Sequence, residues 1–347
     1  MEPPVERKRP GKTLVRVGFG VFIIICLTGV SGLAYLASSP LPEGSEPAPV
    51  VVVPGASTGQ VADLLASAGV IRSPLLFRVV ARLMKADGRI QSGEYVFQPG
   101  INVRDALDIL VKGKVVYHPF TVREGLALED IAALVEEKSF GSKDKFLEAA
   151  SDLSLAPDFV PDDYLKSAKY PLEGYLFPDT YYIRKGMTER DLVVMMTQRF
   201  LEVFTEELQE KAASMGLSPH EAATLSAIVE REAQAPDERP IIAAVYLNRL
   251  KIGMKLDADP TVLYALGKPP DALVLWKDLE VDSPYNTYRN PGLPPGPIGN
   301  FGKASLEAVL NPEDVDFLYF VAKNDGTHAF ARTLSEHNAN RALYQGH

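Results

Sequence analysis

The strongest hydrophobic feature of the chain is an uncharged apolar run from Val17 to Ala37. Five basic residues precede it between positions 7 and 16, and no Lys or Arg follows it until Arg72. About 20 apolar residues can cross a bilayer as a helix, and a basic flank stays in the cytoplasm. The pattern predicts a cytoplasmic tail over residues 1–16 and an uncleaved transmembrane helix over residues 17–37. A cleaved signal peptide is disfavoured, because its apolar region usually spans only about 7–15 residues.

Beyond the apolar run, residues 38–49 are rich in proline and predict an extended tether. Strand-like and helical patterns then alternate over residues 50–117, and a weak internal repeat joins a strand, a glycine turn and a short amphipathic helix. The predicted strands are Val50–Val53, Gly93–Phe97 and Tyr117–Val122. This part of the chain therefore predicts a small α/β unit.

The remainder is mostly helical in pattern, with a proline-rich loop region from Gly267 to about Ser305. Ser218, Pro219 and Glu221 form a helix-start signature. The predicted helices are Leu128–Glu137, Lys143–Ala150, a single long helix Glu189–Glu207, the helix after Ser218, and the helices opened by Pro240 and by Asp259-Pro260. Leu318–Val321 predicts a strand, with Ala329–Ala331 as its hairpin partner. These patterns predict an α+β fold, with a helical connecting region over residues 118–169 and a larger domain over residues 170–347.

Two carboxylates end the helix that follows Ser218, and the helical wheel separates them. Glu230 shares a face with Ala223, Ser226 and Ala227, whose small side chains would leave room for a ligand. Desolvation at the floor of such a cleft would raise its pKa and keep it protonated for acid catalysis. Glu232 lies at the edge of the larger apolar face, where pairing with Arg231 or Arg249 would give it a structural role. A role as an auxiliary catalytic carboxylate is the alternative for Glu232. A solvated surface position is the alternative for Glu230.

Composition narrows the function classes. The 46% hydrophobic and 23% charged content is typical of a globular protein. A formal charge of −9 and a pI of about 5.2 disfavour nucleic acid as a partner. The single cysteine, Cys26, excludes a disulfide within the chain, and the five scattered histidines predict no metal site.

Several motifs, in a consistent order, resemble the YceG/MltG family of endolytic murein transglycosylases. They are Leu172–Tyr181, Leu225–Glu232, Leu247–Leu250, Asp259–Thr261, Ser283–Tyr288, Gly292–Ile298, Leu318–Val321, Gly326–Phe330 and His337–Asn338. The resemblance implies that Glu230 protonates the glycosidic oxygen that leaves N-acetylmuramic acid. The same group would then deprotonate the C6 hydroxyl, giving a 1,6-anhydro end without water. It implies that residues 170–347 form the catalytic domain.

The resemblance also implies a LysM-like module over residues 50–117 and no cofactor. It implies peptidoglycan strands as substrate, peptidoglycan synthases as candidate partners, and a single-pass bacterial inner-membrane protein. Its N-terminus would lie in the cytoplasm and its catalytic domain on the periplasmic side. Whether the LysM-like module binds glycan or only positions the catalytic part stays open. A hydrolytic muramidase that uses the same glutamate with water, and a non-catalytic wall-binding scaffold, are the alternative functions.

Further candidate residues come from the matched motifs. Glu173 either lines the cleft as a second carboxylate or anchors its loop by accepting backbone N–H bonds. Tyr285, Asn286 and Tyr288 predict a glycan subsite, because rings stack on sugars and an amide can bind an N-acetyl group; loop packing is the alternative. We expect three other residues to have mainly structural roles: Asp179 as a turn cap, Asp259 as a helix N-cap, and His328 bonded to a carbonyl.

Overall fold

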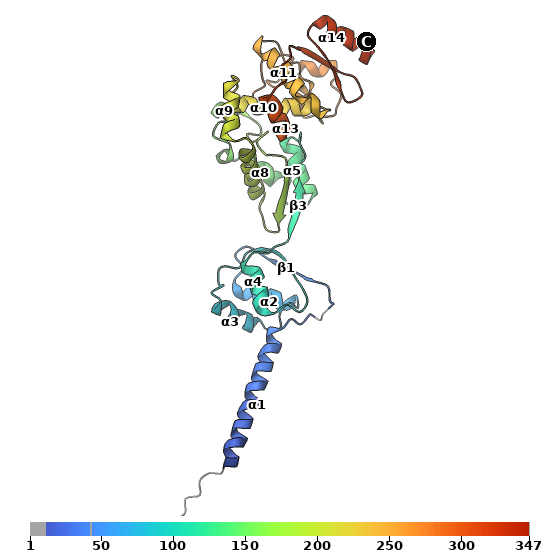
Figure 1. Cartoon of the computed structure of the whole chain (residues 1–347). Helices are drawn as coiled ribbons and strands as arrows, with labels where there is room; N and C mark the ends of the chain where they lie inside the picture. Colours follow the sequence, from blue (N-terminus) through green and yellow to red (C-terminus); the bar gives the residue numbers. More distant parts are fainter. Residues whose placement is uncertain (1–11, 42–43, 347) are drawn as a thin grey trace, which may run out of the picture. The chain divides into compact units, whose positions relative to one another are not determined.

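The computed structural model describes residues 12–41 and 44–346, and side chains for all of these except residues 12–18 and 20. The chain divides into two compact units (Figure 1), Met1–His118 with Arg184–Gly186, and Pro119–Ile183 with Met187–His347. The described residues form helices and three two-stranded sheets, which confirms the mixed α+β class.

The first unit contains a small α/β core. Its elements are α1 (Lys12–Ala37), β1 (Ala48–Val52), α2 (Thr58–Ser67), α3 (Pro74–Leu83), β2 (Gly93–Phe97) and α4 (Val103–Val111). β1 pairs antiparallel with β2, with Val50 opposite Tyr95. Alternation along β1 buries Val50 and Val52 against the helices. Both predicted strands are confirmed, and β1 takes in two residues of the segment predicted as a tether.

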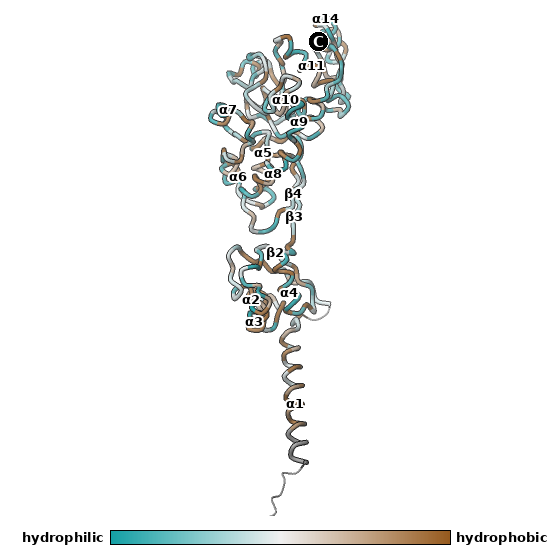
Figure 2. The backbone as a smooth tube through the Cα atoms, turned by 60° about the vertical axis from the view of Figure 1, so that its left-hand side comes forward, coloured by the Kyte–Doolittle hydropathy of each residue, from teal (hydrophilic) through white to brown (hydrophobic). Residues whose placement is uncertain are grey.

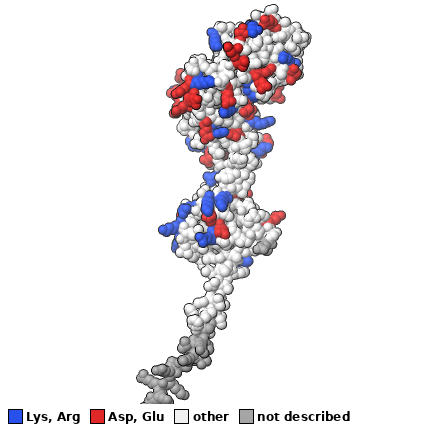
Figure 3. All heavy atoms as spheres, viewed as in Figure 1, with Lys and Arg blue, Asp and Glu red and all other residues white. Residues whose placement is uncertain are grey.

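Helix α1 carries large apolar side chains that the first unit leaves exposed, from Phe19 to Leu36. They give this helix its brown colour in Figure 2, and its described part carries neither acid nor base in Figure 3. Among the residues that the structure describes, no helix has the length and apolarity needed to cross a membrane. The side chains of Val17, Gly18 and Gly20, which belong to the predicted span, lie outside this description.

The second unit holds two clusters of buried side chains, both well populated by aromatic rings. Its elements begin with β3 (Tyr117–Thr121), α5 (Leu128–Glu137), α6 (Lys143–Ala149), η1 (Leu153–Leu155), α7 (Asp162–Ser167), β4 (Thr180–Arg184), α8 (Glu189–Val203) and α9 (Glu206–Ser214). They continue with α10 (Pro219–Glu232), η2 (Pro236–Glu238), α11 (Arg239–Lys251), α12 (Asp259–Ala265), η3 (Trp276–Glu280), α13 (Lys303–Leu310), β5 (Tyr319–Ala322), β6 (His328–Ala331) and α14 (Leu334–Gln345). β3 pairs with β4. β5 and β6 form the predicted hairpin, with Val321 opposite Ala329.

The long helix predicted over Glu189–Glu207 is two helices. α8 ends at Val203, and Phe204 leaves the helical region with φ −91° and ψ 68° before Thr205 opens α9. Phe204 is 1% exposed and packs edge-on against Phe159 and Phe200. The chain therefore breaks the helical periodicity because a sharp turn buries this ring in the aromatic cluster.

Helix α10 is the centre of the second unit. Its start is the predicted capping box, in which the Ser218 hydroxyl accepts from the Glu221 N–H and the Glu221 carboxylate accepts from the Ser218 N–H. Residues 222–229 are all buried, and α9, α11, α12 and α13 all pack against the helix. At its C-terminal end Glu230 and Glu232 are about 200° apart around the axis, so they leave on nearly opposite sides.

Candidate active site

Glu230 lies in a polar cluster at the start of α13. One carboxylate oxygen accepts from the Gly302 N–H at 3.0 Å and the Ser305 hydroxyl at 2.7 Å, and the other lies 3.4 Å from Arg239. The side chain is 6% exposed. Burial, and then the charge of Glu230, raise the pKa of the neighbouring Glu124. Both oxygens of Glu230 are thus engaged by protein groups.

This environment corrects the prediction that the small face of α10 leaves room for a ligand. Ala223, Ser226 and Ala227 are buried, and α13 packs against α10. Small side chains permit close approach of another helix as readily as of a sugar, and close packing fills the space. Glu230 therefore fastens α13 to α10 in this structure.

Glu232 instead lines a cleft of about 500 Å³. The residues that line it come from segments far apart in the sequence, and most belong to matched motifs: Glu232, Arg249, Asp259, Tyr288, Tyr319, Phe320, Val321, His328, His337 and Asn338. The lining is completed by Tyr246, Leu256, Asp257, Trp276, Leu279, Ala322 and further residues of α14. Seven of the nine motifs converge on this one cleft, and Glu230 is not among its lining residues.

The environment of Glu232 suits proton transfer near neutral pH. The carboxyl group is partly buried and accepts a hydrogen bond of 2.7 Å from the Tyr246 hydroxyl. Burial raises the pKa of Glu232 to about 7. The Tyr246 hydrogen bond and the positive charge of Arg249 lower this pKa, and the negative charge of Asp259 raises it further. A carboxyl group with this pKa can both give and take a proton at the pH of most enzymes. Tyr246, rather than Arg231 or Arg249, is therefore its direct partner.

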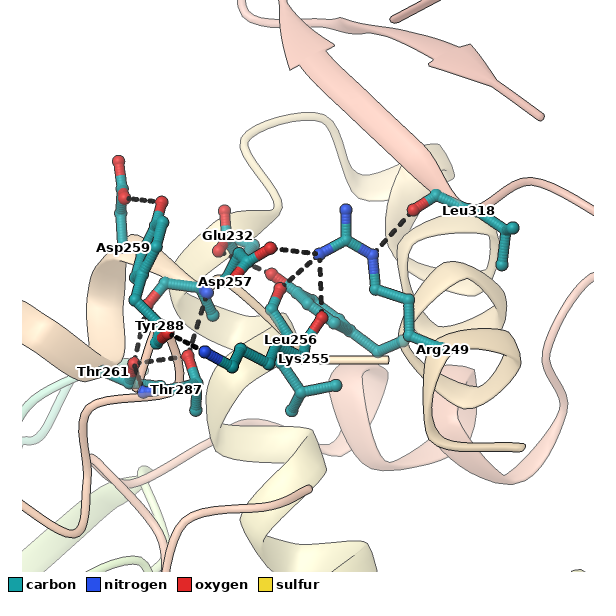
Figure 4. A network of polar contacts seen from close by, with 12 residues as sticks. Glu232, Arg249, Lys255, Leu256, Asp257, Asp259, Thr261, Thr287, Tyr288 and Leu318 are labelled. Carbon is teal, nitrogen blue, oxygen red and sulfur yellow. Dashed lines mark hydrogen bonds and ion pairs between the residues drawn. The ribbon is translucent and has the colours of Figure 1, made fainter. Parts of the chain in front are cut away.

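Arg249 builds one wall of the cleft (Figure 4). Its Nε donates to the Leu318 carbonyl at 2.6 Å, and its Nη1 donates to the carbonyls of Leu256 and Lys255 at 2.6 and 3.3 Å. Asp257 is 3.7 Å from the same guanidinium group. One buried side chain thereby ties α11 to the start of β5 and to the loop before α12.

A second network fixes the aromatic side of the cleft (Figure 4). The Tyr288 hydroxyl donates to Asp259 at 2.6 Å, and the Thr287 hydroxyl accepts from the Ala258 N–H at 3.0 Å and contacts the Thr261 hydroxyl. Burial raises the pKa of Tyr288, with Asp259 adding to the effect. Asp259 is the first residue of α12 and Ala258 is the N-cap, which corrects the prediction that Asp259 caps the helix.

His328 reaches the cleft from β6. Its Nδ1 lies 2.7 Å from a Glu238 oxygen, and its backbone N–H donates to the other oxygen at 2.9 Å. The partner of His328 is thus the partly buried carboxylate of Glu238 rather than the predicted carbonyl, and this contact fixes the orientation of the imidazole ring.

Glu173 and Tyr285 line a different cavity, of about 670 Å³, together with Arg231 and Tyr264. Glu173 is 1% exposed and accepts from the Leu128 N–H at 3.0 and 3.2 Å. Tyr264 and Asn300 donate to the same carboxyl group at 3.3 and 3.4 Å. Burial raises its pKa to about 8 against these bonds. These contacts agree with the alternative in which Glu173 anchors its loop by accepting backbone N–H bonds.

The predicted subsite residues are therefore not together. Asn286 is fully buried and uses its amide within the loop, donating to the carbonyls of Leu279 and Val281 at 2.9 Å and accepting from the Tyr288 N–H. For Asn286 the structure corrects the glycan prediction. Of the four substrate-binding candidates, Tyr288 alone lines the cleft that contains Glu232.

Comparison with known proteins places the chain in a family. The model of the YceG-like family matches residues 50–343. The chain is 39% identical over 303 residues to the endolytic murein transglycosylase of Bacillus subtilis strain 168, with 84% of this chain and 82% of that protein covered. It is 30% identical over 359 residues to the endolytic murein transglycosylase of Streptococcus pneumoniae R6, where the match covers 94% of this chain and 64% of the relative.

A solved structure agrees. The crystal structure of a putative yceG-like protein from Listeria monocytogenes superposes with a TM-score of 0.60 at 34% sequence identity, over 85% of this chain and 98% of that one. The chain belongs to the YceG-like family.

Proposed function

We propose that this protein is an endolytic murein transglycosylase that cleaves the glycan strands of peptidoglycan, with Glu232 as the acid and base. The similarity to two proteins of that name supports the activity. The observation that carries the assignment of Glu232 is the convergence of the matched motifs on a cleft that this carboxyl group lines, where burial raises its pKa to about 7.

The reaction needs one group that cycles a proton. Glu232, protonated, gives its proton to the glycosidic oxygen as the bond from C1 of N-acetylmuramic acid breaks. The resulting carboxylate takes the proton of the C6 hydroxyl, whose oxygen bonds to C1 and closes the 1,6-anhydro ring. No water is consumed and Glu232 ends protonated again. The Tyr246 hydroxyl, which donates to Glu232, stabilises the carboxylate between the two steps.

A hydrolytic muramidase with the same glutamate differs only in the acceptor. Two-carboxylate glycosidases require a second acid group at a defined separation. Sacculi digested with the purified protein and analysed by mass spectrometry distinguish the reactions, because an anhydro product is lighter than a hydrolysed one by one water. We expect anhydro ends, and hydrated ends would overturn the transglycosylase assignment. A protein that binds sacculi and releases neither product would be a scaffold.

We also propose that α1 anchors the protein in the bacterial inner membrane, with the N-terminus in the cytoplasm and residues beyond 40 in the periplasm. The basic residues before Val17 and the exposed apolar side chains of α1 support this. Protease added to spheroplasts should degrade the second unit and spare an N-terminal tag. A protected second unit, or a mature chain that begins near residue 40, would contradict it.

For the first unit we propose a LysM-like role in holding glycan near the catalytic unit. Its size and its α/β core support the proposal. A 119–347 fragment, first checked for a cooperative thermal transition, should lose more activity on sacculi than on short soluble strands. An equal loss on both substrates would leave the first unit with a structural role.

A further inference from the structure

One large side chain of the cleft is almost free of protein contacts. Trp276 opens η3, lines the cleft that contains Glu232, and is 83% exposed. It is the only tryptophan in the sequence. A lone exposed apolar side chain needs no explanation by itself. Trp276 differs because it lines the cleft that contains Glu232, where a bound ligand would cover the ring.

The backbone that presents Trp276 is fixed on both sides. Asp278, which is 6% exposed, accepts from the Leu275 N–H at 2.9 Å and from Lys268 at 2.6 Å. The Lys268 bond, the largest contribution, lowers the pKa of Asp278 and keeps it charged. Asn286 holds the carbonyls of Leu279 and Val281 on the other side. An anchored turn with a free indole is preorganised for binding.

We propose that the indole of Trp276 is a stacking platform for one pyranose ring of the glycan strand bound beside Glu232. This inference rests on the proposed function and adds a subsite to it. A pyranose presents a flat face of C–H bonds that an aromatic ring can cover, while its hydroxyl and acetamido groups need polar partners. Asn338 and Arg341, both exposed on α14, line the same cleft and supply such groups.

A protein partner is the competing occupant, because Leu273 and Leu275 on the same loop are 84% and 48% exposed. The glycan is favoured because Trp276 lines the cleft and these two leucines do not. Leu273 therefore provides a matched control: a large, exposed apolar side chain three residues away on the same loop, outside the cleft.

Steady-state kinetics on soluble, uncross-linked peptidoglycan strands test the subsite. Stacking that is equal in the ground and transition states acts on KM alone. Trp276→Ala should raise KM roughly tenfold with kcat unchanged, Trp276→Phe should restore part of the loss, and Leu273→Ala should match the parent. An unchanged KM in Trp276→Ala, or an equal rise in Leu273→Ala, would overturn the proposal.

The single tryptophan also reports binding without turnover. Full-length Glu232→Gln protein titrated with the same strands should show a saturable change in tryptophan emission. Poly-L-glutamate, a non-glycan polymer without aromatic residues, should cause none. Strands that bind by calorimetry while the emission stays constant would remove Trp276 from the subsite. A parent enzyme that releases no anhydro ends would defeat the proposed function instead, and the titration would still decide the place of Trp276.

Discussion

The two sides of α10 at its C-terminal end hold carboxyl groups in opposite situations. Glu230 faces α13, where a backbone N–H, a hydroxyl and a guanidinium group satisfy its oxygens. Glu232 faces a cleft and has one neutral donor, Tyr246, at 2.7 Å. The oxygens of Glu230 are occupied by protein donors, whereas burial with a single hydroxyl donor raises the pKa of Glu232 to about 7. Proximity in the sequence therefore says little about the roles of these two groups.

Glu173 is a third buried carboxyl group that can be compared with Glu232. Burial raises its pKa to about 8, a larger shift than that of Glu232, yet four hydrogen bonds hold it at the start of α5. A perturbed pKa marks a functional site only when the group is also accessible to a reactant. The nearly complete burial of Glu173 and the donors that occupy its oxygens, rather than the size of the pKa shift, separate it from Glu232.

The largest expected effect is the loss of catalysis in Glu232→Gln. Glutamine keeps the size of the side chain and cannot cycle a proton, so anhydro-product formation should fall by roughly 10²–10⁴ or more. The thermal midpoint should stay close to that of the parent. Release of anhydro products at the parental rate would exclude Glu232 and return the assignment to Glu230.

The matched variant Glu230→Ala should act on stability. It leaves Arg239 without its buried partner, a change that typically costs about 3–5 kcal/mol in the free energy of unfolding. Chemical denaturation measures the loss, and activity well below the unfolding temperature should persist. A stable Glu230→Ala protein without activity would reverse the comparison between the two glutamates.

A smaller effect is expected from Tyr246→Phe, which removes the donor that lowers the pKa of Glu232. Glu232 must be protonated to start the reaction, so parental activity should decline as the pH rises through about 7. Without the Tyr246 hydroxyl, the pKa of Glu232 should be higher, so the decline in activity should move to higher pH. The pH profile of kcat/KM checks the shift, and an unmoved profile would show that another group sets it.

The last prediction, on the pH dependence of stability rather than on catalysis, concerns Glu173→Gln. Its folded-state pKa of about 8 lies above the ordinary value of 4.5, so the folded protein holds a proton that the unfolded chain releases. The stability of the parent should therefore fall as the pH rises from 4.5 toward 8. Glutamine, which is always neutral, should flatten this dependence. Denaturation curves across that range provide the measurement; parallel curves for the two proteins would contradict the assignment.

Local signals in the sequence were sufficient for many elements. Ser218, Pro219 and Glu221 defined the start of α10 because capping depends on neighbours within one turn. Alternation and glycine turns located β2, α5 and the β5–β6 hairpin for the same reason. The ordered motifs identified the family and hence the class of reaction.

Tertiary structure alone decided which glutamate faces the cleft. A helical wheel distinguishes the faces of an isolated helix. It cannot show that α13 packs against the face of α10 that carries small side chains. The break at Phe204 depends on an aromatic cluster contributed by distant segments. The pKa of Glu232 depends first on its burial by surrounding segments and then on Tyr246, Asp259 and Arg249, which lie on α11 and α12. Desolvation and charge act through space, so the sequence supplied the residues of the site and only packing gave them their roles.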